Sequence, residues 1–327
     1  MLIILLKKSI LKDKKENKMS TEKKVMPAED VRKLQLIELE ILLEVDRICR
    51  ENNIEYFLLA GTLLGAVRHD GFIPWDDDLD IQMNRREYEK FCEVCKTKLN
   101  TEKFFLQNYE TDLEYRWGYA KVRRKGTEYL RLGQEAIKCF SGVSIDIFVY
   151  DNVPDSKMGR VIFYYLRRAC IKTLYSVIGV TQDPNRFKRF LYHALCHVNK
   201  KIPLKIMDIM AKISNKKETE YMYCISFYRQ DGFINNDKLL HRAIKAKWLN
   251  ERTEIEFEGF PFYVYKDYME YLTTKYKNLW EYPPESQRFL HPPKSYYLDV
   301  DIDLRGRSVE EYMKKEYIYK TKEDMLY

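Results

Sequence analysis

Four aspartates within five residues are the strongest sign of chemistry in this sequence. Asp76, Asp77, Asp78 and Asp80 lie in the stretch PWDDDLDIQM, directly after a Pro-Trp step. Carboxylates this close repel one another, and folding alone gives no reason to place them together. The segment is therefore either a solvated acidic loop or the binding site of a cation.

The pattern around Asp80 favours the cation. DLDIQM alternates acidic and apolar residues as a strand does, so Asp78 and Asp80 are predicted to share one face. Asp76 continues that row, and Leu79 and Ile81 fill the core behind it. Two carboxylates on a rigid strand suit a hard divalent cation, and Mg²⁺ commonly combines one or two carboxylates with water and substrate phosphates. We therefore expect Mg²⁺, with Mn²⁺ as an alternative, and phosphoryl chemistry.

Two further segments fit the same chemistry. Gly61-Thr62 is predicted to lie between a strand and a short helix, where a phosphate can approach the backbone and helix N–H groups point at the anion. Asp146 lies in the middle of the predicted strand VSIDIF, where a carboxylate is costly unless it is paired or metal-bound. Together with Asp78 and Asp80, these residues predict a site of metal-assisted group transfer.

Hydrophobic periodicity predicts the elements that position these residues. Residues 28–51 place apolar side chains at helical spacing, with Glu38, Glu44 and Arg47 on the opposite face. IEYFLLA is predicted to be a short buried strand, LLGAVRH a helix of about two turns and REYEKFCEVCKTKL a second helix. EYRWGYAKVRRKGTEYLR predicts strand, turn and strand, and GVSIDIFVYDNVP a further strand. This alternation predicts an α/β chain of the mixed α+β type, a small mixed sheet with flanking helices.

The middle of the chain is predicted to be helical and basic. Between Ser156 and Glu220 there are 14 Lys or Arg and 4 Asp or Glu, a net charge of +10, whereas the whole chain has +7. Two segments, GRVIFYYLRRACIKTLYSVIG and NRFKRFLYHALCHVNKKIPLKIMDIMAKIS, alternate large apolar with basic residues. A basic amphipathic helix can lie on a membrane surface. An ordinary helical subdomain with a solvated basic face predicts the same pattern.

The chain divides into four predicted segments. A disordered basic tail covers 1–27, a catalytic core 28–155, a basic helical subdomain 156–246, and a C-terminal segment, 247–327, completes the core. The first six residues are apolar, but a spanning helix needs about 20, and a secretory signal has its positive charge before the apolar run. Met19 is an alternative start of the protein.

The composition is that of a soluble globular protein in a reducing compartment. Hydrophobic residues make up 45% of the 327 and charged residues 33%, and the modest positive charge does not by itself imply nucleic acid. Seven cysteines, an odd number, argue against a disulfide framework. Cys92 and Cys95 form a CxxC on a predicted helix. Buried thiols are the expected explanation, and a zinc site with His193, Cys196 and His197 is the alternative.

The stretch LAGTLLGAVRHDGFIPWDDDLDIQM resembles the LicD family of phosphocholine transferases, a branch of the nucleotidyltransferase fold that includes the fukutin-type ribitol-phosphate transferases. AKVRRKGT, SIDIFVYDNVP and IEFEGFPFYVYKDYMEYLTTKYKNLWEYPP follow in the family's order. The resemblance covers residues 30–292. One departure is Tyr276-Lys277, where the family usually has Tyr-Gly, so the backbone geometry that this glycine supplies is in doubt.

The resemblance implies a phosphotransferase with a CDP-linked donor, usually CDP-choline. An acceptor hydroxyl would attack the phosphorus that bears the alcohol, and CMP would leave. Asp78 and Asp80 are then expected to bind the metal, and Asp146 to be a third ligand or the base for the acceptor hydroxyl. The expected ligands of the donor phosphate are Gly61, Thr62, Arg68, His69 and Lys121, with Asp76 and Asp77 holding water or capping the strand.

Several of these residues have plainer explanations. Asp146 could pair with Arg123 or Arg124 instead of a metal. Arg68 could simply balance the acidic charge, and Lys121 could be a solvated lysine on a strand. Gly61-Thr62 could be an ordinary turn. A choline group would need an aromatic cage, and the available rings are Trp117, Tyr119, Tyr150 and Tyr282.

The expected acceptor is a surface glycan or glycolipid, such as a teichoic-acid or lipopolysaccharide precursor. The protein is then expected in the cytoplasm, where its basic segment could hold it on the anionic inner face of the membrane. No nucleic acid partner is expected. Two alternatives remain: a nucleotidyltransferase that moves NMP from an NTP to a small molecule, and a non-catalytic module that binds membranes or polyanions.

Overall fold

The computed structural model describes residues 26–226, 238–240, 243–276, 278–288 and 293–325. The predicted N-terminal tail and Met19 lie outside these residues, apart from the last two positions of the tail. Among the described residues, no helix combines the length and the apolar character that crossing a bilayer requires.

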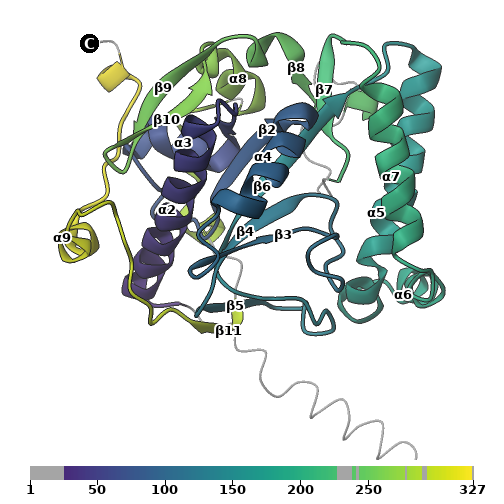
Figure 1. Cartoon of the computed structure of the whole chain (residues 1–327), viewed down its shortest axis with the longest axis horizontal. Helices are drawn as coiled ribbons and strands as arrows, with labels where there is room; N and C mark the ends of the chain where they lie inside the picture. The colour runs from purple at the N-terminus through teal and green to yellow at the C-terminus, as the bar shows by residue number, and fades with distance from the viewer. Residues whose placement is uncertain (1–25, 227–237, 241–242, 277, 289–292, 326–327) are drawn as a thin grey trace, which may run out of the picture.

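A mixed sheet forms the centre of the molecule (Figure 1). Its strand order is β1-β2-β6-β4-β3, and β7 pairs with β6 and with β8. The strands are β1 Phe57–Leu58, β2 Asp80–Asn84, β3 Phe104–Gln107, β4 Ala120–Arg124, β6 Ser144–Asn152, β7 Tyr221–Cys224 and β8 Ile244–Lys245. β2 and β6 run parallel, and the other pairs are antiparallel. The predicted α/β class of mixed α+β type is confirmed.

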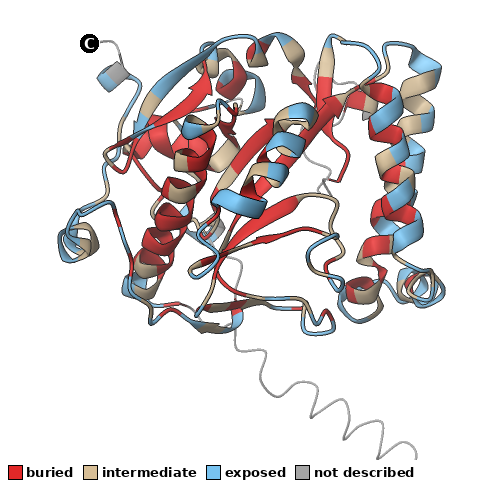
Figure 2. Cartoon of the chain, viewed as in Figure 1, coloured by how far each residue is buried: buried red, intermediate tan, exposed pale blue. Residues whose placement is uncertain are grey.

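Three helices of the N-terminal half pack around this sheet: α2 Ala28–Glu51, α3 Ala60–His69 and α4 Arg85–Lys98. α2 has the bounds that periodicity predicted, and its apolar stripe from Leu34 to Ile48 is buried against the sheet (Figure 2). The prediction for Glu38 is wrong, because its side chain is 2% exposed and lies on the buried side of α2. Glu38 directly follows Ile37 and stands three residues before Ile41, so it belongs to the edge of the same stripe.

The C-terminal part completes this body. β9 Arg252–Phe257 and β10 Phe260–Tyr265 form a hairpin that packs on β1 and α3, and α8 Tyr268–Lys275 follows. Both strands of the predicted strand-turn-strand segment are present, as β4 and β5 Glu128–Arg131. However, β5 pairs with β11 Pro293–Tyr297 and not with β4. The remaining elements are α9 Val309–Lys314 and the short 3₁₀ helices η2 Lys238–Leu240, η3 Ala246–Leu249, η4 Glu285–Gln287 and η5 Glu323–Met325.

The basic middle segment is helical, as predicted. α5 Lys157–Gln182, α6 Arg186–Leu195 and α7 Lys201–Ser214 lie together along one side of the molecule (Figure 1). α5 and α7 contribute to a second hydrophobic cluster, which includes Cys170, Leu174, Leu204 and Met207, beside the main core. The division of the chain into four segments stays a prediction.

Candidate active site

Two of the predicted aspartates are neighbours across parallel strands. Asp80 opens β2, and its Cα partner on β6 is Asp146. The backbone N–H of Asp146 donates to the carbonyl of Leu79 at 2.9 Å, which fixes the register at this point. Since paired strands lie about 4.8 Å apart, this register places the two carboxylates side by side at one end of the sheet. Two residues that are 66 positions apart in the sequence are thus neighbours in the sheet.

β2 begins at Asp80, two residues later than predicted, so Asp76, Asp77 and Asp78 lie in the loop before the strand rather than on its face. Burial raises the pKa of Asp76 well above its usual value, and the charges of Asp78, Asp77 and Asp80 raise it further. Burial likewise raises the pKa of Asp80, and Asp78 and Asp146 add to the effect. The hydroxyl group of Tyr129 donates to Asp77 Oδ2 at 2.7 Å. The loop therefore concentrates negative charge that a bound cation would relieve.

Three cations border this acidic group. Lys121 on β4 forms an ion pair with Asp146, its antiparallel partner, and the guanidinium of Arg131 lies 3.7 Å from Asp78 Oδ2. Lys275, in the last turn of α8, and Lys121 both lower the pKa of Asp80. The alternative pairing of Asp146 with Arg123 or Arg124 is wrong. Arg123 donates to Gln107 and to the carbonyl of Gly142, and Arg124 to Glu40.

The carboxylates fit Mg²⁺ through a few direct ligands rather than through a full protein cage. In the part of the chain that the structure describes, no three His, Cys, Asp or Glu side chains are arranged to hold a metal ion. Mg²⁺ takes most of its ligands from water and substrate phosphate, so one or two carboxylates of this acidic group would be sufficient. The trio of Asp78, Asp80 and Asp146 as metal ligands stays a prediction.

The CxxC motif of α4 has the properties of buried thiols. Cys95 is buried and Cys92 partly buried, and both belong to the free cysteines. Burial raises the pKa of the Cys92 thiol to about 11 and raises that of Cys95 further. Among the residues that the structure describes, neither thiol belongs to a group of three His, Cys, Asp or Glu side chains that could hold a metal ion.

Gly61 and Thr62 lie in the first turn of α3, against the acidic loop. The Thr62 hydroxyl accepts a hydrogen bond of 2.8 Å from the backbone N–H of Asp80, so it anchors the start of β2. A Cβ atom on Gly61 would lie 2.9 Å from Asp76 Oδ2, which explains the glycine. Ala60 just before it takes a φ of 51°, an uncommon conformation for alanine that marks local strain. The role of this turn in binding donor phosphate stays a prediction.

Arg68 and His69 lie at the other end of α3. Arg68 is buried, donates to the carbonyl of Leu279 at 3.1 Å and stacks 4.5 Å from the ring centre of Tyr282. His69 Nδ1 contacts the carbonyl of Ile318, and burial lowers the pKa of His69 to about 4. Both side chains therefore hold the C-terminal segment, and the described contacts give them no link to the aspartates. Their assignment to donor phosphate stays an untested prediction.

A small cavity adjoins the aspartates on the side of β4 and β5. Its lining includes Glu38, Asp77, Lys121 and Arg131, together with the rings of Trp117, Tyr119 and Tyr129. Sequence reasoning missed Glu38 and Arg131. Glu38 Oε2 is buried without a hydrogen-bonding partner, and its pKa is raised by burial and by the charges of Asp78 and Asp77. In the sequence, Glu38 could have been recognised as a carboxylate at the edge of the apolar stripe of α2. No such signal marked Arg131, because its neighbourhood depends on the pairing of β5 with β11.

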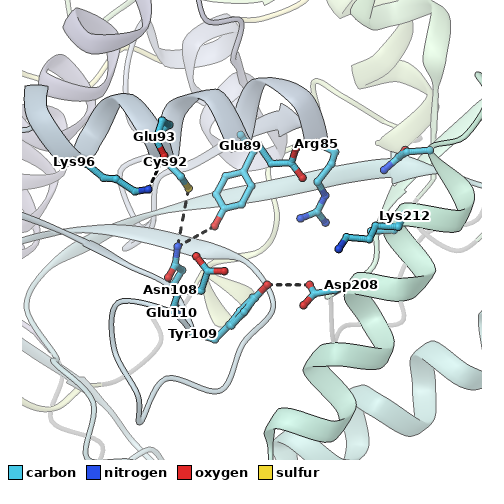
Figure 3. A pocket seen from close by; sticks show the side chains of 13 residues that line it. Arg85, Glu89, Cys92, Glu93, Lys96, Asn108, Tyr109, Glu110, Asp208 and Lys212 are labelled. Carbon is cyan, nitrogen blue, oxygen red and sulfur yellow. Dashed lines mark hydrogen bonds and ion pairs between the residues drawn. The ribbon is translucent and has the colours of Figure 1, made fainter.

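A second cavity, of about 510 Å³, lies at the opposite end of β2, where α4 begins (Figure 3). It separates α4 from α7. Tyr109 bridges the two sides by donating to Asp208 Oδ1 at 2.9 Å. Its charged residues are Arg85, Glu89, Glu93, Lys96, Glu110, Asp208 and Lys212. None of the predicted site residues lines this cavity.

Comparisons with known proteins identify relatives of this chain. A family model described as the LicD/FKTN/FKRP nucleotidyltransferase domain matches residues 53–173, which include every residue assigned to the site from sequence. The chain is 30% identical over 274 residues to the lipopolysaccharide cholinephosphotransferase LicD of Haemophilus influenzae, covering 82% of this chain and 98% of that protein. Uncharacterized proteins of Rickettsia typhi and Rickettsia prowazekii match over 55 and 42 residues, at 42% and 52% identity, which is 18% and 16% of their lengths.

Proposed function

This chain belongs to the LicD family and is a transferase, and from that premise we propose that it moves phosphocholine from CDP-choline to a hydroxyl group of a lipopolysaccharide-type glycan. The observation that carries the proposal is the Asp80–Asp146 pair on adjoining parallel strands, beside the first turn of α3. The relative that matches nearly along its whole length is named as a lipopolysaccharide cholinephosphotransferase, which supports the transferred group and the class of acceptor. A teichoic-acid precursor is the alternative acceptor.

In the proposed reaction, the acceptor oxygen forms a bond to the phosphorus that carries choline. The bond from that phosphorus to the oxygen bridging to CMP breaks, and CMP leaves with the electron pair. The proton of the acceptor hydroxyl must pass to a base. We assign it to Asp146, because Lys121 contacts Oδ1 of this carboxylate and thereby orients the second oxygen.

Asp78 and Asp80 are the residues that would hold Mg²⁺ or Mn²⁺. The bound ion would supply charge neutralisation at the donor diphosphate. Arg131 and Lys275 add positive charge from the protein itself, which suits the negative charge that develops on the CMP leaving group. The positions of these side chains on strands and at a helix end keep them fixed before the substrate arrives.

The test is CMP release by the purified full-length protein with CDP-choline, Mg²⁺ and a soluble lipopolysaccharide-derived oligosaccharide. Asp80→Asn and Asp146→Asn should each lower the rate at least about a hundredfold. Asp299→Asn is the matched control, because this aspartate is 83% exposed, and it should leave the rate unchanged. Removal of divalent cations with EDTA should abolish release, and added Mg²⁺ or Mn²⁺ should restore it.

The same assay separates the competing activities. If CDP-choline, CDP-ribitol and CDP-glycerol all fail to give CMP, the proposal is wrong. Pyrophosphate release from an NTP would identify a nucleotidyltransferase instead. A thermal-shift screen that compares NTPs with CDP-alcohols separates the two activities independently, because the true donor stabilises the folded protein by mass action and raises its Tm.

A further inference from the structure

The short helix α6 turns its apolar side chains toward solvent. Phe187, Phe190 and Leu191 stand at helical spacing and are 69%, 72% and 46% exposed. On the opposite side, Tyr192 packs against Gly179 of α5. An amphipathic helix of a globular protein normally buries its apolar stripe. α6 instead packs on α5 through Tyr192 and leaves its apolar stripe exposed.

The same helix is strongly basic. Arg186, Lys188 and Arg189 lie between and beside the exposed rings, and residues 186–195 contain no Asp or Glu. Arg186 and Lys188 are exposed and Arg189 is half-buried. A helix that combines exposed phenyl rings with basic side chains has the composition of an element that lies in a lipid–water interface.

Exposed apolar residues are concentrated on the three helices α5, α6 and α7. Of the sixteen large apolar side chains that the described part of the chain leaves exposed, ten lie on α5, α6 or α7. Besides those of α6, they are Met158, Ile162, Tyr165 and Leu166 of α5 and Ile202, Ile209 and Ile213 of α7. Single exposed apolar residues are ordinary, but such a concentration marks an interaction surface.

α6 lies close to the candidate active site. It follows the C-terminal end of α5, where Gln182 is within about 3.0 Å of a Cβ built on Gly133. Gly133 is next to Gln134, which lines the cavity beside the aspartates. Arg116 donates to the carbonyl of Leu174 at 3.4 Å, and the next residue, Trp117, lines the same cavity. The exposed helix therefore belongs to the same end of the molecule as the cavity.

We propose that α6 docks this protein on an anionic lipid bilayer, with Phe187 and Phe190 inserted among the lipids and the basic side chains at their phosphate groups. The inference rests on the proposed function and deepens it, because the acceptor would then be a glycolipid presented at that surface. The segment from Ser156 to Glu220 carries a net charge of +10, which repels a second copy of the same face. A soluble polyanion would satisfy the charges but would leave the phenyl rings in water.

The test is flotation of the full-length protein with vesicles, in the absence of donor and acceptor. Vesicles containing about 30% phosphatidylglycerol should bind the protein, whereas phosphatidylcholine vesicles should bind it weakly, and about 0.5 M NaCl should reduce the binding. The double variant F187S/F190S should lower partitioning at least about tenfold, because two apolar rings no longer enter the bilayer. Tyr297→Ser is the matched control, since Tyr297 is 53% exposed on β11, and it should bind normally.

Charge is tested separately with Lys188→Gln against Lys98→Gln, an exposed lysine in the last turn of α4. Only the first should weaken binding to anionic vesicles, by about fivefold. The proposal is overturned if anionic vesicles do not bind the protein at low salt, or if F187S/F190S binds as well as wild type. Binding to heparin without binding to vesicles would identify a polyanion site instead.

Failure of this inference can be told apart from failure of the proposed function. F187S/F190S should release CMP at the wild-type rate with the soluble oligosaccharide, and more slowly with a glycolipid acceptor in anionic vesicles. If the chain bound vesicles but released no CMP, docking would stand and the transfer reaction would be wrong.

Discussion

Replacing Glu38 by methionine is predicted to stabilise the protein while leaving its fold intact. The Glu38 carboxylate is 2% exposed, Oε2 has no hydrogen-bonding partner, and the nearest charges are mostly those of other carboxylates. A buried polar group without a partner costs about 1–3 kcal/mol. Methionine is apolar and similar in length, so Glu38→Met should raise the free energy of unfolding by about 1–3 kcal/mol and the Tm by about 2–10 °C.

The raised pKa of Glu38 determines how the stabilisation by Glu38→Met should change with pH. Burial raises the pKa of Glu38 in the folded protein well above its value in the unfolded chain. The wild type therefore loses stability as pH rises from the unfolded pKa toward the folded one, because only the unfolded state ionises freely there. The part of the gain from Glu38→Met that comes from ionisation should be absent near pH 4, grow as pH rises and level off above the folded pKa, while the cost of burying the uncharged carboxyl group remains at every pH.

Glu40 provides the matched control for Glu38, two residues further along α2. It is also buried, but it accepts hydrogen bonds from Arg124 at 2.8 Å and from Lys103 at 3.2 Å. Glu40→Met should destabilise the protein by about 3–5 kcal/mol, because the buried guanidinium of Arg124 loses its carboxylate partner and keeps only backbone carbonyl acceptors. Urea unfolding of both variants between pH 4 and pH 8 checks the pair. A lower Tm for Glu38→Met at pH 7.5 would show that the Glu38 carboxylate is compensated, and the reasoning would fail.

Three further predictions concern the neighbourhood of the site. Lys121→Met should lower the free energy of unfolding, measured with urea, by about 3–5 kcal/mol, because the Asp146 carboxylate loses its cation. The double variant K121M/D146N should recover part of this stability. Gly61→Ala should lower the rate of CMP release at least about tenfold, because the new Cβ displaces the Asp76 side chain. It should destabilise the protein by less than about 1 kcal/mol, since only the flexible end of Asp76 has to move. An unchanged rate would show that Gly61 is not part of the site. The pKa of His69 is lowered to about 4, so the wild type should lose stability as pH falls from about 6.5 toward 4, and His69→Phe should flatten that part of the Tm profile.

Local patterns in the sequence predicted the elements well, and failed where a position depends on distant pairing. Apolar spacing alone located α2 from Ala28 to Glu51 and the strand that holds Asp146. Spacing could not show that Asp80 and Asp146 would be strand partners, although both were assigned to one site. No local pattern pointed to Arg131, because its position near Asp78 depends on a strand more than 160 residues further along the chain.

Hydrogen bonds connect the C-terminal motif to the candidate active site. The hydroxyl group of Tyr271 on α8 accepts a hydrogen bond of 3.3 Å from the backbone N–H of Ala60, at the strained start of α3. It also accepts one of 3.2 Å from Lys275, whose charge lowers the pKa of Asp80. α8 therefore sets both the backbone of the 60–62 turn and the charge beside Asp80. A sequence change in this motif acts on the site through that contact, so Tyr271→Phe should lower CMP release by removing the acceptor for Ala60, while Thr273→Ala, on the exposed side of the same helix, should not.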